Sequence, residues 1–248
     1  MRKNITKILI ATISSVSLLS SCNFLDVDHY FEATFKEDSI FYSKRNAESY
    51  LWNVPGRFPE AGNIWGNSWF PGEFASDELT GRWPTSEFWG MQFTVGKINE
   101  ENVPNWNLWY GMYRTIRRCN IMLANIDKVH DMTEPDKNEY VSYVHFMRGY
   151  AYYILFVNWG PCLIIGDEII PTDESSEYYN KERSTFDETV DYICEEFAKS
   201  LKGLKDPANQ SLNFFERPTK GAALGFISRL RLYQASPTFN GGDLARKA

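Results

Sequence analysis

The sequence predicts a mostly α-helical fold, built from antiparallel helical hairpins with long irregular excursions between them. Three observations lead to this prediction. Four segments after residue 100 carry apolar residues at helical spacing. The second helices of the two resulting pairs place small residues at matching positions. Between residues 56 and 97, by contrast, neither a helical nor a strand period is present, although this stretch is rich in aromatic residues.

The chain of 248 residues begins with an export signal, which we place at residues 1–21. Arg2, Lys3 and Lys7 precede an apolar run over residues 8–19, which is the pattern of a secretory signal peptide. The run is too short to cross a bilayer as a helix, which needs about 20 residues. Nothing later in the sequence is long and uncharged enough, so we expect no transmembrane helix.

Cys22 is the expected lipid attachment site. Leu19-Ser20-Ser21-Cys22 is similar to the bacterial lipobox, in which small residues admit the signal peptidase and the cysteine sulfur receives a diacylglycerol. The alternative is an ordinary cysteine. A triacylated N-terminus offers the two or more chains that stable membrane anchoring requires. We expect residues 22–37 to form the lipidated tether and residues 38–248 to form the folded domain.

The charge balance argues against a nucleic-acid partner. Without the signal, which holds three basic residues and no acidic ones, 23 Lys and Arg stand against 32 Asp and Glu, a net charge of −9. An acidic protein repels the phosphate backbone of DNA and RNA.

The cysteines and histidines indicate neither a metal nor a cofactor. Beyond Cys22, the thiols of Cys119, Cys162 and Cys194 are odd in number, widely spaced and without a C-x-x-C pair, so we expect buried free thiols. The histidines are scattered with no H-x-x-x-H spacing. They are His29, His130 and His145.

The first two helices are expected on either side of the aromatic stretch. One spans residues 38–53 and ends at Pro55 and Gly56. The other spans residues 106–124, where apolar side chains recur every three or four positions, and Pro135 breaks the chain after it.

The third helix, over residues 140–157, becomes apolar nearly all round in its second half. A helix that is apolar on all sides is buried, so we expect it at the centre of the bundle. Gly160 and Pro161 stop it. The short apolar segment over residues 162–170 is β-prone.

Two further helices complete the second pair. Thr185 and Glu188 form a predicted capping box at the start of an apolar stripe over residues 186–204. Pro218 is expected as the first residue of the last helix, because proline favours that position. Pro237 is expected to terminate this helix.

The two helical pairs resemble each other in outline, which suggests a repeat of the tetratricopeptide kind. Arg148-Gly149-Tyr150-Ala151 matches Lys220-Gly221-Ala222-Ala223, 72 positions later, which is about twice the length of that repeat unit. Small residues at matched places let helices approach closely. Chance similarity between two amphipathic helices is the alternative.

The aromatic stretch is the candidate ligand site. Four of the eight tryptophans lie there among carboxylate, amide and guanidinium side chains, and aromatic rings supply flat apolar platforms for ligands. Alternatively, the rings pin a long loop to the helices. We expect Trp83 and Trp89 to be the exposed ones, because polar and turn-forming residues surround them. The candidate residues are Trp65, Asn67, Trp69, Asp77, Glu78, Arg82, Trp83 and Trp89.

No catalytic residue is expected. Asp77 and Glu78 are two carboxylates, but adjacent residues on an extended backbone point to opposite faces, which suits glycoside hydrolysis poorly. The sequence contains no G-x-S-x-G, no glycine-rich phosphate loop and no H-E-x-x-H. We therefore do not expect an enzyme.

Several segments together resemble the SusD/RagB family of surface lipoproteins from Bacteroidetes, both in their residues and in their order along the chain. The most specific are Arg217 to Ala223 and Tyr233 to Pro237. The segment Asn158 to Leu163 departs from the family's usual Tyr-Gly-Asp-x-Pro-Leu, with Trp159 and Cys162 as the differences. The other similar segments are Cys22 to Val27, Ser76 to Glu78, Trp109 to Asn120 and Arg148 to Tyr153.

The resemblance implies a SusD-like superhelix of tetratricopeptide-like hairpins whose excursions form a ligand face. It implies an outer-membrane, surface-exposed lipoprotein that passes oligosaccharides, or peptides in RagB-like members, to a TonB-dependent SusC-like transporter. Family members are about twice this long, so residues 38–248 are expected to be the N-terminal portion of such a domain. A second interpretation is a helical-repeat scaffold with a protein partner only, in which all the aromatic residues are core. Exposed tryptophans would favour the first interpretation.

Overall fold

The structure, a computed structural model, describes residues 40–59, 76–77, 89–99, 101, 108–169, 171, 180–206, 208 and 217–240. These residues form helices and no strand. The helices are α4 (Lys44–Asn53), η2 (Val54–Arg57), α6 (Trp89–Thr94), α7 (Leu108–Asn125), η4 (Ile126–Lys128), α8 (Glu134–Trp159), α9 (Phe186–Ser200), α10 (Lys220–Ala235) and α11 (Pro237–Asn240). The expected signal, Cys22 and the tether lie outside the described residues.

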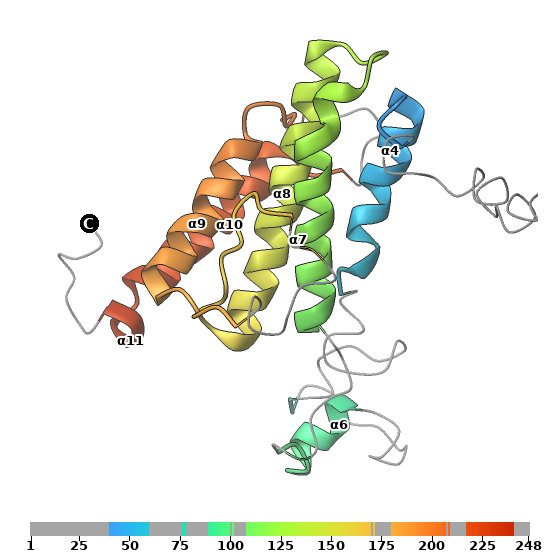
Figure 1. Ribbon diagram of the computed structural model, residues 1–248. Helices are drawn as coiled ribbons and strands as arrows, with labels where there is room; N and C mark the ends of the chain where they lie inside the picture. The colour runs from blue at the N-terminus through green and yellow to red at the C-terminus, as the bar shows by residue number, and fades with distance from the viewer. Residues whose placement is uncertain are drawn as a thin grey trace, which may run out of the picture.

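The long helices form an antiparallel bundle in which each helix packs against the next one along the chain. α7 packs on α8, α8 on α9, and α9 on α10. Figure 1 shows that α4 lies on the far side of α7 from α9 and α10. It also shows that α7 begins at the end of the bundle where α8 ends and α9 begins, which we call the lower end. The predicted architecture of antiparallel helical hairpins is confirmed.

The helix α8 is the centre of this bundle, as its apolar second half predicts. Tyr143, Tyr152 and Leu155 are almost completely buried, although they lie on different sides of the helix. Gly149 faces α9 closely, because a Cβ atom there would lie 3.3 Å from the Cβ of Glu196. A small residue at this position therefore does allow the two helices to pack closely.

Three expected helix boundaries are wrong, and local capping explains two of them. α8 begins at Glu134 and not at residue 140, because Thr133 and Asp136 form a capping box and Pro135 occupies the first turn. α10 begins at Lys220, one residue after its N-cap Thr219, so Pro218 lies outside the helix.

The third boundary is that of the first helix. Residue 40 is helical, residues 41–43 interrupt the expected helix with a turn, and α4 begins at Lys44 with Ser43 as its N-cap. Two other boundaries are as predicted: α9 begins at the Thr185 and Glu188 capping box, and α8 ends at Gly160. α10 ends before Pro237 as expected, but Pro237 also begins α11.

None of the described helices combines the length and the apolar character that a bilayer crossing needs.

Candidate functional site

The expected ligand stretch is described only in part. The side chain of Asp77 is exposed, and Trp89 begins α6, although only its backbone is described. In α6, Met91 and Gln92 are buried. The other candidates lie outside the described residues and remain predictions; they are Trp65, Asn67, Trp69, Glu78, Arg82 and Trp83.

The segment over residues 162–169, which we call the α8–α9 loop, is not the strand that its apolar sequence predicts. Helix side chains, and not a neighbouring strand, satisfy its backbone. Leu163 donates its N–H to the hydroxyl of Tyr113 at 2.9 Å, and this hydroxyl donates in turn to the Leu163 carbonyl at 3.1 Å. The N–H of Ile165 donates to the Tyr152 hydroxyl at 2.9 Å. The β-prone composition does not reveal these partners, because they are helix side chains 13 and 50 positions away in the sequence.

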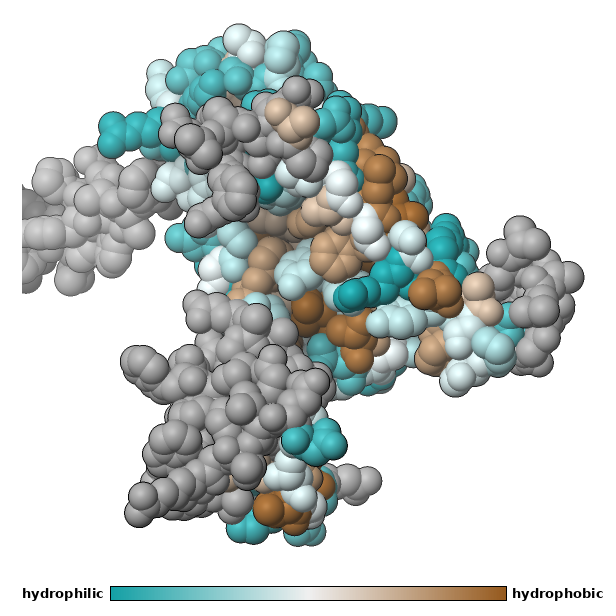
Figure 2. Space-filling model, turned by 180° about the vertical axis from the view of Figure 1, so that it is seen from behind, coloured by the Kyte–Doolittle hydropathy of each residue, from teal (hydrophilic) through white to brown (hydrophobic). Residues whose placement is uncertain are grey.

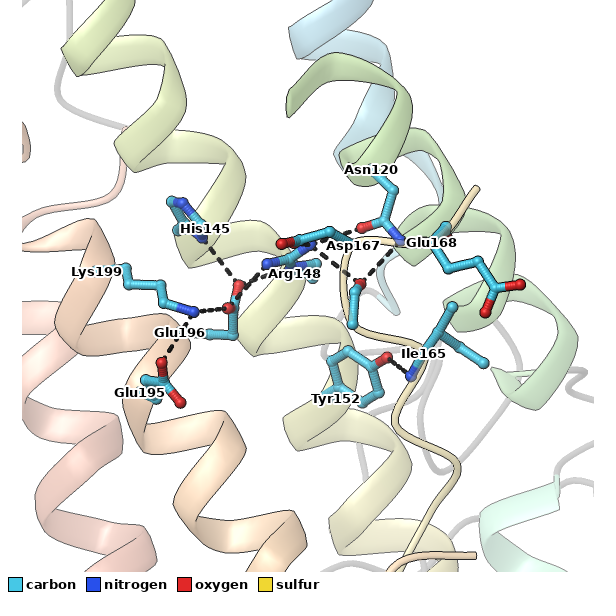
Figure 3. Close-up of polar contacts among 11 residues, drawn as sticks. Asn120, His145, Arg148, Tyr152, Ile165, Asp167, Glu168, Glu195, Glu196 and Lys199 are labelled. Carbon is cyan, nitrogen blue, oxygen red and sulfur yellow. Dashed lines mark hydrogen bonds and ion pairs between the residues drawn. The ribbon is translucent and has the colours of Figure 1, made fainter. Parts of the chain in front are cut away.

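The same loop is held further along by α7 and α8 (Figure 3). The amide nitrogen of Asn120 donates to the carbonyls of Gly166 at 3.0 Å and Glu168 at 2.7 Å. Arg148 donates to the carbonyl of Gly166 at 3.2 Å and to the carboxylate of Asp167 at 2.6 Å. The left-handed φ of 66° at Gly166 lets the chain turn there. Four helix side chains therefore fix the loop to the bundle at five of its residues.

Arg148 links this loop to α9 through a buried ion pair. Its guanidinium forms a two-pronged contact with Glu196, at 2.6 Å from Nε and 2.9 Å from Nη2. His145 lies 3.0 Å from the same carboxylate, and Lys199 contacts it at 3.2 Å. Burial alone would raise the pKa of Glu196, but the bonds with His145 and Arg148 outweigh it and lower this pKa to about 2. The carboxylate thus stays ionised in the folded protein at neutral pH.

The lower end of the bundle carries an aromatic cluster beside this loop. The ring of Trp109, at the start of α7, meets that of Trp159, at the end of α8, edge to face at 5.6 Å. Both rings are half-buried. The guanidinium of Arg183 lies over the Trp109 ring at 5.0 Å and donates to the carbonyl of Trp159 at 3.3 Å. Two tryptophans and a cation therefore meet at one edge of the molecule.

An open pocket of about 330 Å³ lies at the same end, between α8, α9, α10 and α11. Phe186 and Phe239 stack there with ring centroids 4.6 Å apart. Phe239 and Tyr233 remain 49% and 36% exposed, so flat ring surface is open to solvent. The complete lining is Phe156, Val157, Gly160, Pro161, Phe186, Tyr233 and Phe239.

The sequence did not identify Trp109, Trp159 or Phe239 as site residues. The apolar spacing places Trp109 in a helical stripe, and Trp159 falls in the expected helix stop. No pattern of neighbouring residues distinguishes these three rings from core aromatics, because their surroundings depend on how the helices pack.

Comparison with known proteins identifies the family to which the chain belongs. A SusD-like family model, described as "Starch-binding associating with outer membrane", matches residues 23–232. The chain belongs to the SusD-like family. The predicted resemblance is confirmed, and the helical architecture of the described residues is that of this family.

Solved SusD-like structures share the fold at low sequence identity. A laminarin-binding SusD-like protein is 18% identical with a TM-score of 0.62, over 84% of this chain and 43% of its own. A SusD-like carbohydrate-binding protein from Bacteroides fragilis is 18% identical with a TM-score of 0.61, over 84% of this chain and 41% of its own. Surface glycan-binding protein A from Bacteroides thetaiotaomicron is 15% identical with a TM-score of 0.57, over 80% and 40%.

This SusD-like chain thus spans about two fifths of the length of those structures. No curated protein matches it.

Proposed function

We propose that this SusD-like protein captures glycans at the cell surface and delivers oligosaccharides, uncut, to a TonB-dependent SusC-like transporter. The observation that carries the proposal is the family match, which covers residues 23–232. The names of the structural relatives, which include a laminarin-binding protein and a surface glycan-binding protein, support a glycan as the ligand class.

The lower end of the bundle and the aromatic stretch are the proposed ligand face. A pyranose ring presents C–H groups on its faces and hydroxyls at its edge. The half-buried rings of Trp109 and Trp159 suit the faces, and the guanidinium of Arg183 suits the hydroxyls. Trp83 and Trp89 are proposed to extend this surface, with Asp77 and Arg82 as polar partners. The other candidates of the stretch are Trp65, Asn67, Trp69 and Glu78.

The proposed location is the outer face of the outer membrane, with a lipid on Cys22 as the anchor. A family description that names association with the outer membrane supports this location. Digestion of intact cells with an external protease tests it. The protein should be degraded without rupture of the cells; protection until the outer membrane is broken would contradict surface exposure.

Calorimetric titration of the protein without its lipidated N-terminus tests ligand capture. The titrants are plant, host and microbial glycans and, for a RagB-like alternative, peptides, with mass spectrometry of the recovered ligand. We expect one glycan class to bind and to be recovered intact. Trp159→Ala and Trp83→Ala should each weaken binding at least tenfold, by about 1.4 kcal/mol. Tyr42→Ala, at an exposed ring that packs on His130 beyond the other end of α7, is the matched control.

Each contrary outcome has a distinct meaning. A folded protein that binds nothing across the panel would favour the scaffold interpretation. Recovery of cleaved ligand would show that the protein is an enzyme. Binding that resists every ring substitution would place the ligand elsewhere on the molecule.

A further inference from the structure

A polar pocket of about 260 Å³ lies between α4 and α7, on the side of α7 away from α9 and α10. Figure 2 shows that apolar surface, in brown, covers the middle of the molecule and the α10 side, whereas the upper end, where α4 begins, is hydrophilic. We call this cavity the α4–α7 pocket. Its described lining residues offer hydroxyl, amide and guanidinium groups but no carboxylate. They are Ile40, Asn46, Ser49, Tyr50, Asn53 and Arg118.

The guanidinium of Arg118 is held on one side and open on the other. Its Nη1 donates to the backbone carbonyl of Asn53 at 3.1 Å and to the side-chain Oδ1 of the same residue at 3.2 Å. No described residue accepts a hydrogen bond from its Nε or its Nη2. These two nitrogens form an edge that binds two oxygens of an anion through parallel hydrogen bonds. The bonds to Asn53 therefore orient Arg118 and leave an anion-binding edge available.

Two more arginines lie one helical turn from residues of this pocket. Arg45 is exposed four positions before Ser49 on α4, and Arg114 is exposed four positions before Arg118 on α7. The Arg114 guanidinium lies over the ring of Tyr110 at 5.3 Å. Neither arginine forms an ion pair with a residue that the structure describes.

This concentration of positive charge stands out in an acidic protein. The chain beyond the expected signal has a net charge of −9, yet α7 contains three arginines and no aspartate or glutamate. The single acidic residue of α4, Glu48, pairs with Arg217 at 3.6 Å. Elsewhere in the bundle, Arg148 and Arg231 also pair with carboxylates. The described part of the chain thus leaves the charge at the α4–α7 pocket without a neutralising group, and such a site attracts anions.

We propose that the α4–α7 pocket binds the acidic group of a glycan, either a uronic acid carboxylate or a sulfate ester, at a site separate from the proposed ligand face. Arg118 binds the anion through Nε and Nη2, and Arg45 and Arg114 add attraction from the rim. The hydroxyl of Ser49, which bonds to no described residue, is available to a sugar hydroxyl. The volume suits one sugar unit and not a chain, because it lies at the small end of ligand pockets.

The anion site follows from the contacts of Arg118, whereas the choice of a glycan as carrier of the anion rests on the proposed function. The test must therefore separate the charge of the ligand from its sugar. An oligogalacturonide and its methyl ester form one suitable pair, since the ester removes the charge and keeps the sugar chain. A sulfated galactan oligosaccharide and its desulfated form are the second pair, and they distinguish sulfate from carboxylate.

Calorimetric titration of the protein without its lipidated N-terminus, in dilute buffer at neutral pH, compares the members of each pair. In at least one pair the acidic form should bind about tenfold or more tightly than the neutral form, and added salt should reduce this preference. Arg118→Gln should abolish the preference. Arg229→Gln, which removes an exposed arginine from α10, is the matched control and should retain it.

A second variant tests the pocket without changing any charge. Ser49 is exposed on α4, so Ser49→Phe should leave the melting temperature unchanged while its ring fills the cavity. This variant should bind the acidic form about tenfold or more weakly than the unaltered protein. Tyr42→Ala, at an exposed ring that does not line the pocket, should bind it normally.

Three results would each overturn the proposal: acidic forms bound no better than neutral ones in both pairs, equal effects of Arg118→Gln and Arg229→Gln, or normal binding of the acidic form by Ser49→Phe. The proposed function would survive any of them if a neutral glycan still binds and Trp159→Ala weakens it. Conversely, a preference for the acidic form that needs Arg118 but withstands Trp159→Ala and Trp83→Ala would support the pocket and contradict the proposed ligand face.

Discussion

The ion pair between Arg148 and Glu196 is a buried contact between two helices that no local sequence pattern predicts. Both side chains are almost fully buried, and 48 positions separate them. Sequence reasoning found the capping box of Thr185 and Glu188 because those partners are three residues apart. It assigned Arg148 only to a family motif, since nothing in the sequence shows which helix faces it.

Breaking this pair should be far more damaging than replacing it. We expect Glu196→Leu to lower the free energy of unfolding by about 3–5 kcal/mol, because the Arg148 charge is left buried without its main partner. The double change Arg148→Met with Glu196→Leu should recover most of that loss, since two apolar side chains of similar volume need no partner. Urea denaturation of both single variants and the double variant measures the coupling. Strictly additive effects would show that the pair is not coupled.

The lowered pKa of Glu196 also predicts a stability change with pH. A carboxyl group whose pKa falls from its ordinary 4.5 to about 2 on folding stabilises the folded state above pH 4.5. This contribution, on the order of 3 kcal/mol, should be lost as the pH falls from 4.5 toward 2. Urea midpoints measured at several pH values should decline steeply in that window, and the decline should be shallower in Glu196→Gln. Equal slopes in the two proteins would rule out Glu196 as the source.

The helices as elements follow from the sequence more closely than their ends do. All four long helices of residues 108–240 were predicted, because apolar periodicity is a property of many residues together. The ends depend on single hydrogen bonds. The sequence predicts a break at Pro135, but Thr133 caps α8 two residues earlier and the proline lies in the first turn. It predicts a helix start at Pro218, but Thr219 is the N-cap of α10.

The turn after α9 depends on one close backbone contact. A Cβ atom at Gly203 would lie 2.5 Å from the carbonyl oxygen of Asn138 on α8, and its N–H donates to the Ser142 hydroxyl at 2.9 Å. Gly203→Ala should therefore destabilise the protein by about 1–3 kcal/mol, as overpacking does in protein cores. Gly56→Ala, where a Cβ would meet nothing within 4 Å, is the control. Equal melting temperatures for the two variants would contradict this packing.

At the scale of the whole molecule, the helical bundle was predictable and the position of its ligand face was not. Burial of α8 follows from composition alone. The aromatic stretch has no period, so the placement of rings such as Trp83 depends on contacts that the sequence does not reveal. The pocket at Phe239 is hidden for a related reason, because residues from four helices meet there only in the folded chain.

The thiol reactivity of the three described cysteines should distinguish opening of the whole bundle from opening of the α8–α9 loop alone. Burial raises the pKa of Cys119 and of Cys162 to about 12, so neither thiol should react with a disulfide reagent at pH 8 in the folded protein. Cys194 is buried as well. In Tyr113→Phe, which removes the hydroxyl that holds Leu163, we expect Cys162 alone to become reactive. Simultaneous labelling of all three thiols would mean that the loop opens only when the bundle unfolds.

The attachment of the α8–α9 loop has an evolutionary consequence. Tyr113, Tyr152 and Asn120 bind N–H and carbonyl groups, which almost every amino acid possesses, whereas Arg148 also binds the side chain of Asp167. Substitutions at loop positions whose side chains are not buried, and whose φ does not favour glycine, therefore leave the backbone bonds intact. A lineage that encounters a new nutrient can exchange these side chains while the helices remain the same.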